Sequence, residues 1–192
     1  MEQFNIPYRD EKIENAIAFF VHEYHKKTKR DLRQTFLYKF LAFFDFEIFR
    51  DTGEPALGLV YDAMDHGPVP EEIYKERRFL RTDKYISEKD GNQLIFKSMP
   101  STHPDLDYFS PAEIAQMQRL IEIYATNYMT VSDISDASHE AILAWKRTYK
   151  KDKNGKIPYE VEFFGDVFSK SNPNTAEEHF LISHALRTAA CR

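Results

Sequence analysis

Cysteine is almost absent from this chain of 192 residues, because Cys191 is the only one. A single cysteine excludes an intramolecular disulfide and a zinc site of the usual cysteine spacing. A chain of this length can bury a core of several helices without a disulfide or a metal, and we expect no cofactor. The same shortage of cysteine favours a reducing cytoplasm as the location.

Long uninterrupted apolar runs are also missing. The most apolar stretch, around residues 36–49, is broken by Lys39, Asp45 and Glu47, whereas a membrane-spanning helix needs about 20 apolar residues. Residues 1–25 carry charges throughout, which does not fit a signal peptide. We therefore expect a soluble protein that has no membrane partner.

The chain has no excess of positive charge. It contains 31 acidic and 26 basic residues, which gives a formal net charge of −5. Binding to nucleic acid relies on a net or clustered positive field, so this balance argues against nucleic acid as the main partner. Two short basic clusters, residues 26–33 and 146–156, keep a nucleic-acid-binding autoregulator as an alternative.

Motifs of common catalytic sites are absent: the sequence has no glycine-rich phosphate loop and no nucleophile elbow. His22 and His25 lie three residues apart without the spacing of a zinc motif, and a solvated helix end explains them. Asp45, Glu47 and Asp51 flank an apolar helix, where charges normally face solvent. A hydrolase using Asp, Glu and His residues stays an alternative, because paired buried carboxylates can perform acid–base catalysis.

Aromatic residues and helical periodicity are abundant. Sixteen Phe and eleven Tyr supply the apolar area of a helical core. Apolar residues recur at steps of three and four, which predicts a mainly α protein. The predicted helices cover residues 10–28, 31–52, 56–63, 71–80, 111–124 and 130–139, a segment around Trp145, and residues 175–189.

Helix starts are marked by capping residues. The pattern of a capping box occurs at three helix starts: Ser110 with Glu113, Thr130 with Asp133, and Thr175 with Glu178. Asp31 is placed to cap the second predicted helix.

Two segments depart from the helical pattern. Apolar residues on either side of Asp90-Gly91-Asn92 predict a small antiparallel β-hairpin at about residues 84–99. The segment His66-Gly67-Pro68-Val69-Pro70 predicts a rigid corner that either presents a surface or joins two helices.

Polar residues 150–156 indicate a linker or exposed loop. We therefore expect a single compact multi-helix domain over residues 1–149, with residues 150–192 as an extension packed on it.

Three segments together resemble the Panacea domain family, the SocA-like antitoxins that include phage-associated GepA-type proteins. The first is residues 37–45, a lysine followed by an apolar run. The second runs from Gly53-Glu54-Pro55 through Tyr61-Asp62-Ala63 to Gly67-Pro68-Val69-Pro70. The third is residues 135–145, which contain Ser138-His139 and Trp145. The resemblance covers about residues 31–147, and Ala42 departs from it where the family often has a tyrosine.

The resemblance implies a mainly helical antitoxin of a type II toxin–antitoxin system. Such a protein neutralises a toxin encoded by an adjacent gene, usually by direct contact. An alternative within the family is a proteolytic adaptor that delivers the toxin to a protease. The resemblance transfers no catalytic residues, so we expect no enzyme.

The expected binding surface follows the second and third segments. Its residues are Tyr61, Asp62, His66, Gly67, Pro68, Val69 and Pro70, supported by His139 and Trp145. Aromatic side chains and a rigid corner suit a binding site because they lose little entropy on association. For His139 and Trp145, packing in the core is the competing interpretation.

Overall fold

The computed structural model of the chain describes residues 4–78, 80–100 and 102–190, and these form seven α-helices with two small antiparallel sheets. The helices are α1 (Arg9–Thr28), α2 (Gln34–Thr52), α3 (Glu71–Glu76), α4 (Pro111–Tyr124), α5 (Val131–Ala141), α6 (Leu143–Lys151) and α7 (Thr175–Ala190). The strands are β1 (Leu32–Arg33), β2 (Tyr61–Met64), β3 (Gly67–Pro70), β4 (Tyr85–Asp90) and β5 (Gln93–Ser98). Two short 3-10 helices, η1 (Tyr159–Glu162) and η2 (Val167–Ser169), precede α7. The predicted mainly α fold is confirmed.

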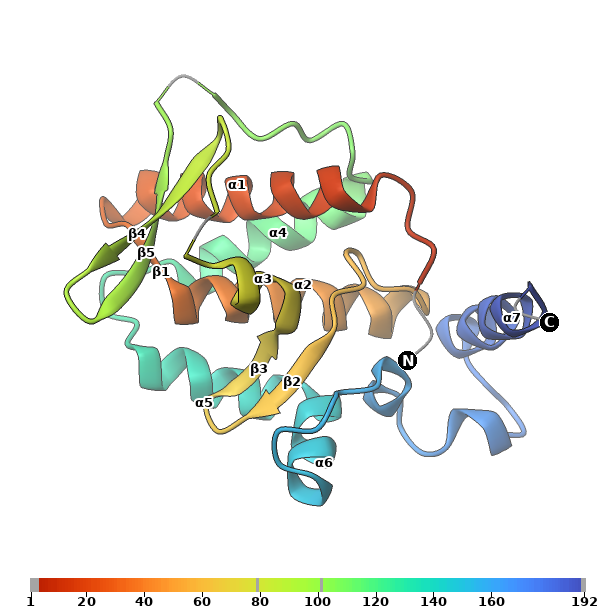
Figure 1. Ribbon diagram of the computed structural model, residues 1–192. Helices are drawn as coiled ribbons and strands as arrows, with labels where there is room; N and C mark the ends of the chain where they lie inside the picture. The colour runs from red at the N-terminus through yellow and green to blue at the C-terminus, as the bar shows by residue number, and fades with distance from the viewer. Residues whose placement is uncertain (1–3, 79, 101, 191–192) are drawn as a thin grey trace.

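Helix α2 is the centre of the molecule (Figure 1). Every residue from Phe36 to Phe49 is buried, so the helix is covered on all sides and not along one stripe. It packs against α1, α4, α5, α7 and strand β3. The aromatic side chains stack within this core, as Phe20 of α1 does on Phe40 of α2, with ring centroids 5.0 Å apart.

The β-structure is more extensive than the single predicted hairpin. Strands β4 and β5 form the expected hairpin, and β1 adds a third strand with Leu32 opposite Phe96. Buried Leu32 pairs with this sheet, so α2 begins at Gln34, and Asp31 does not cap it. Strands β2 and β3 form a separate two-stranded sheet.

The predicted helix at residues 56–63 is wrong. The Asp45 carboxylate accepts hydrogen bonds from the backbone N–H groups of Leu57, Gly58 and Leu59, at 2.6, 3.2 and 3.2 Å. These bonds hold the segment as a loop that leads into β2, because the same donors are then not available to a helix. The predicted helix at residues 71–80 is shorter than expected and ends at Glu76.

Two of the four predicted caps are correct. Ser110 with Glu113, and Thr130 with its aspartate, form complete capping boxes on α4 and α5. On α7 the cap lies one residue earlier than predicted. Asn174 and Glu177 exchange hydrogen bonds there in place of Thr175 and Glu178.

Residues 150–190 contact the rest of the chain closely. The backbone of residues 154–157 runs beside β2, where the N–H of Ala63 donates to Gly155 and that of Ile157 donates to Tyr61. Part of the segment predicted as a linker therefore continues the β2–β3 sheet. Helix α7 packs its Phe180 ring against Phe49 of α2, 5.5 Å between centroids. None of the described helices combines the length and the apolar character needed to cross a membrane.

Candidate functional site

The β2–β3 hairpin gathers most residues of the predicted binding surface. Its strands pair Tyr61 with Pro70 and Asp62 with Val69, and Asp65 and His66 form the two-residue turn. The hairpin lies across α2 with its tip directed toward α5 and α6 (Figure 1). The corner predicted from the prolines is therefore a hairpin tip, not a link between two helices.

Gly67 is the point where the hairpin, α2 and α5 meet. Its φ of 97° lies in the left-handed region, and a Cβ at this position would lie 2.5 Å from Ser138 Oγ and 2.6 Å from Lys39 Nζ. Glycine is required here both for its backbone conformation and for the close approach. The three segments that carry the family resemblance thus converge on one buried junction, formed by Lys39, Gly67 and Ser138.

Replacing Gly67 with alanine should lower the free energy of unfolding by about 2–4 kcal/mol, because overpacking adds to backbone strain. Gly91→Ala is the matched control: Gly91 also has a positive φ, of 58°, but no atom lies within 4 Å of its added Cβ. It should cost only about 1 kcal/mol. Chemical denaturation of both variants measures the difference, and equal losses would show that the junction is not tightly packed.

Lys39 is a buried amine without a counter-ion in the described part of the chain. Its side chain is 1% exposed, and Nζ donates one hydrogen bond, to the carbonyl of Pro68 at 3.3 Å. Among the described residues, no carboxylate forms an ion pair with it. Burial lowers the pKa of Lys39 from 10.5 to about 7, since a charged amine without a counter-ion is poorly solvated there.

The Lys39 amine should make stability depend on pH. Between pH 7 and 10.5 the unfolded chain binds the proton and the folded chain releases it, so the free energy of unfolding rises with pH. Relative to Lys39→Met, wild type should gain about 2 kcal/mol between pH 7 and pH 9. Denaturation curves at both pH values test this, and a constant difference between the two proteins would contradict it.

An aromatic stack holds the hairpin tip from the other side. The His139 ring lies flat on Trp145 at 3.9 Å, and Trp145 stacks on Tyr149 at 4.8 Å. Trp145 Nε1 donates to the carbonyl of Met64 at 3.1 Å, and the Tyr149 hydroxyl donates to Asp65 at 2.7 Å. Burial lowers the pKa of His139, and the nearby Lys39 charge acts in the same direction.

The predicted surface residues divide by burial. Tyr61, Gly67, Pro68, Pro70 and Trp145 are buried, Asp62, Val69 and His139 are half-buried, and His66 is exposed. We use the name hairpin tip for the three exposed residues Met64, Asp65 and His66. Sequence reasoning missed Met64 and Tyr149, and the only signal for them was their nearness to the corner and to Trp145.

The carboxylates of α2 have structural bonds. Asp45, expected on the solvent side, is fully buried and accepts the hydroxyl hydrogens of Tyr61 at 3.0 Å and Tyr159 at 2.9 Å. Burial raises the pKa of Asp45, and its hydrogen-bond donors oppose that rise. Glu47 is buried too and binds Arg119. Only Asp51 is exposed as expected.

His22 and two lysines in each basic cluster have nearby partners as well. His22 contacts Glu23 and the ring of His103, and the described residues contain no group of three side chains suited to hold a metal. Lys26 pairs with Glu23 and Lys27 with Glu122.

In the second basic cluster, Lys146 pairs with Glu140, and Lys156 pairs with Asp62 and Glu71. These ion pairs reduce the field that each cluster offers to a polyanion.

Comparison with known proteins identifies one family. Residues 37–146, more than half of the chain, match the family described as antitoxin SocA-like, Panacea domain. The matched span contains Lys39, the β2–β3 hairpin, His139 and Trp145, and it ends before α7. No curated protein and no solved structure matches the chain.

Proposed function

The chain belongs to the family of SocA-like antitoxins with a Panacea domain, and from this we propose that it is the antitoxin of a type II toxin–antitoxin system. It neutralises a toxin encoded by an adjacent gene through direct protein–protein binding, and it does so without catalysis. The observation that carries the proposal is the family match itself, whose residues converge on the junction beneath the hairpin tip.

The hairpin tip has the properties of a preorganised binding element. Met64 is 37% exposed, and His66 and Asp65 are exposed beside it. The buried Gly67 junction and the Trp145 stack fix the backbone on both sides of the tip, so little conformational entropy is lost on binding. An apolar side chain with polar neighbours at its edge matches the usual arrangement of a binding hot spot.

Direct binding is favoured over nucleic-acid binding and hydrolysis by the contacts described above. The ion pairs of Lys26, Lys27, Lys146 and Lys156 reduce the charge free for phosphates. The Asp45 oxygens are engaged by five donors in the interior, which leaves that carboxylate no access to a substrate.

Co-expression tests the proposal. The adjacent small open reading frame is placed under an inducible promoter in a bacterial host, with and without this chain, and growth is followed. We expect growth arrest that this chain relieves, with the two proteins recovered as a complex. Toxicity without relief, or relief without a complex, would contradict neutralisation by binding.

A further inference from the structure

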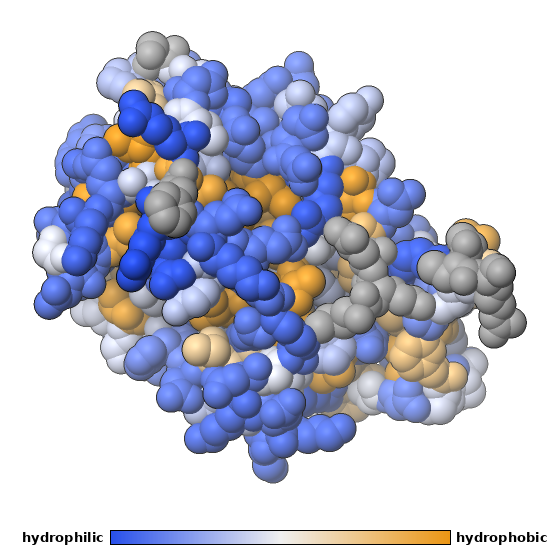
Figure 2. Space-filling view, viewed as in Figure 1, coloured by the Kyte–Doolittle hydropathy of each residue, from blue (hydrophilic) through white to orange (hydrophobic). Residues whose placement is uncertain are grey.

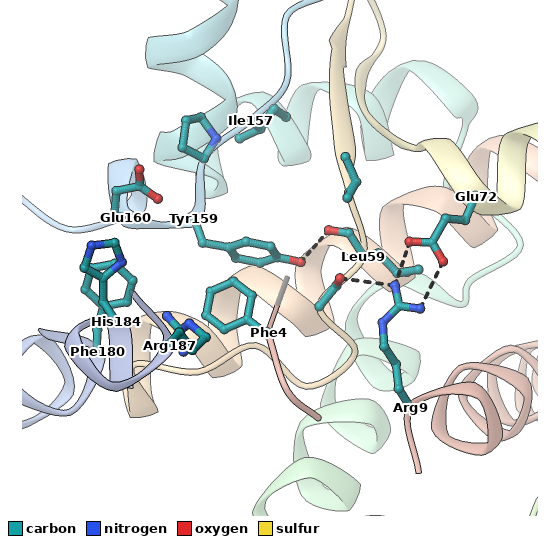
Figure 3. Close-up of a pocket in the computed structure, with 13 residues that line it drawn as sticks. Phe4, Arg9, Leu59, Glu72, Ile157, Tyr159, Glu160, Phe180, His184 and Arg187 are labelled. Carbon is teal, nitrogen blue, oxygen red and sulfur yellow. Dashed lines mark hydrogen bonds and ion pairs between the residues drawn. The ribbon is translucent and has the colours of Figure 1, made fainter. Parts of the chain in front are cut away.

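A pocket of about 430 Å³ lies between the N-terminal segment, the loop before β2, residues 157–160 and α7 (Figure 3). Its volume falls within the range of about 300–1,000 Å³ that is typical of small-molecule sites. Most of its wall is apolar, formed by Phe4, Leu59, Val60, Ile157, Pro158 and Phe180. Because α7 supplies one side, the pocket extends beyond the span that matches the antitoxin family.

One end of the pocket is closed by an ion pair between Arg9 and Glu72, in which the Arg9 Nε alone has no acceptor among the described residues. The Arg9 guanidinium donates to both oxygens of Glu72, at 3.0 and 2.6 Å, and to the carbonyl of Gly58 at 3.2 Å. Figure 3 shows this pair on the opposite side of the Tyr159 ring from the α7 side chains. This end therefore offers a neutral and fixed wall.

The other end holds Arg187, whose ion pair with Glu54 is long, and Glu160 also lines the pocket on this side (Figure 3). Arg187 of α7 lies over the Phe4 ring at 4.5 Å, and its side chain is only 16% exposed. Its nearest described carboxylate, Glu54, is 3.8 Å away, longer than a hydrogen bond. The buried Nε of Arg187 has no acceptor among the described residues. Buried donors without a partner are rare and point to a missing acceptor.

We propose that this pocket binds a small amphipathic carboxylate, with the acid group on Arg187 and the apolar body against Phe4, Val60 and Phe180. The planar guanidinium matches a carboxylate in shape and charge, which makes it the preferred receptor for this anion. The proposal does not rest on toxin binding, since the hairpin tip and the pocket are formed by different residues.

Straight-chain acids provide the probe. The purified full chain is titrated with hexanoate, octanoate and decanoate by isothermal titration calorimetry, and with octanol as the uncharged control. We expect saturable binding at one site, tighter by about fourfold for each added methylene until the pocket is filled. Octanol should bind at least about tenfold more weakly than octanoate, because it lacks the charge that pairs with Arg187.

Variants assign the site. Arg187→Gln should weaken octanoate binding by about tenfold or more, and Val60→Trp, at a half-buried wall residue, should block it. Arg78→Gln, at an exposed arginine outside the pocket, should leave it unchanged. Circular dichroism checks that each variant folds. If Val60→Trp does not fold, Arg187→Gln alone assigns the site. No saturable binding of any acid, equal binding of octanol, or unchanged binding to Arg187→Gln would overturn the proposal.

Discussion

Replacing Asp45 with alanine should lower the free energy of unfolding by about 5 kcal/mol, enough to unfold much of the protein at moderate temperature. The Asp45 carboxylate joins α2 to the loop before β2, to Tyr61 in β2 and to Tyr159 in η1. Its removal leaves three backbone N–H groups and the Tyr61 hydroxyl buried without an acceptor, whereas the Tyr159 hydroxyl keeps the carbonyl of Leu59 at 2.8 Å. Each unsatisfied group costs about 1–3 kcal/mol.

Two further variants make the Asp45 result specific. Asp51→Ala removes an exposed carboxylate from the same helix and should leave the unfolding midpoint unchanged. Asp45→Asn keeps the shape and one carbonyl oxygen, so its loss of stability should lie between those of the other two. Urea denaturation measures all three, and a loss at Asp45→Ala as small as that at Asp51→Ala would contradict the role of this carboxylate.

Replacing Met64 with aspartate should weaken the complex with the toxin by about 100-fold while the chain stays folded. Met64 is the apolar residue of the hairpin tip, and truncation of a central hot-spot residue typically costs at least about 2 kcal/mol. An added carboxylate also has to be desolvated in the complex, which increases the loss. Calorimetric titration of the toxin with each variant gives the ratio of dissociation constants.

Tyr128→Asp is the matched control for the hairpin tip. Tyr128 is 93% exposed and lies in the connection between α4 and α5, which is not part of the β2–β3 hairpin. Like Met64→Asp, this substitution places a carboxylate at an exposed apolar position, so it tests whether such a change at any exposed site weakens the complex. Equal losses at Met64 and Tyr128 would remove the hairpin tip from the proposed interface.

Local sequence signals predicted the elements that depend on nearby residues. Periodic apolar residues gave α1, and Ser110 with Glu113 gave the start of α4, because a capping box lies within one turn of the helix. The hairpin of β4 and β5 followed from its turn residues around Gly91. In these cases the cause lies within a few residues of the effect.

The predictions failed where a distant residue decides the conformation. The segment before β2 is a loop because Asp45, at least twelve residues earlier, binds its backbone. Strand β1 exists because β5 offers it a partner some sixty residues away along the chain. Neither cause is visible in local periodicity, since both depend on tertiary contacts.

The candidate site shows the same division. Gly67 and Trp145 were identified from the sequence, and the burial of Trp145 agrees with the competing interpretation that it packs in the core. The burial of Gly67 was not predicted, because sequence does not reveal which side of a corner faces solvent. Lys39 stood out as a charge within an apolar run, and the structure adds its approach to Gly67. Met64 was not singled out from the sequence, and the structure identifies it by its exposed side chain and by the hydrogen bond that Trp145 donates to its carbonyl.

The most direct test of the proposed function uses two purified proteins, this chain and the product of the adjacent gene. They are mixed in increasing ratio without any protease, and the toxin's activity and the complex on size-exclusion chromatography are measured together. Neutralisation by binding predicts that activity falls to zero at a fixed stoichiometry as the complex appears, and that Met64→Asp shifts both curves together. A toxin that stays active in the presence of excess chain, or that is lost only when a protease is added, would contradict the proposal.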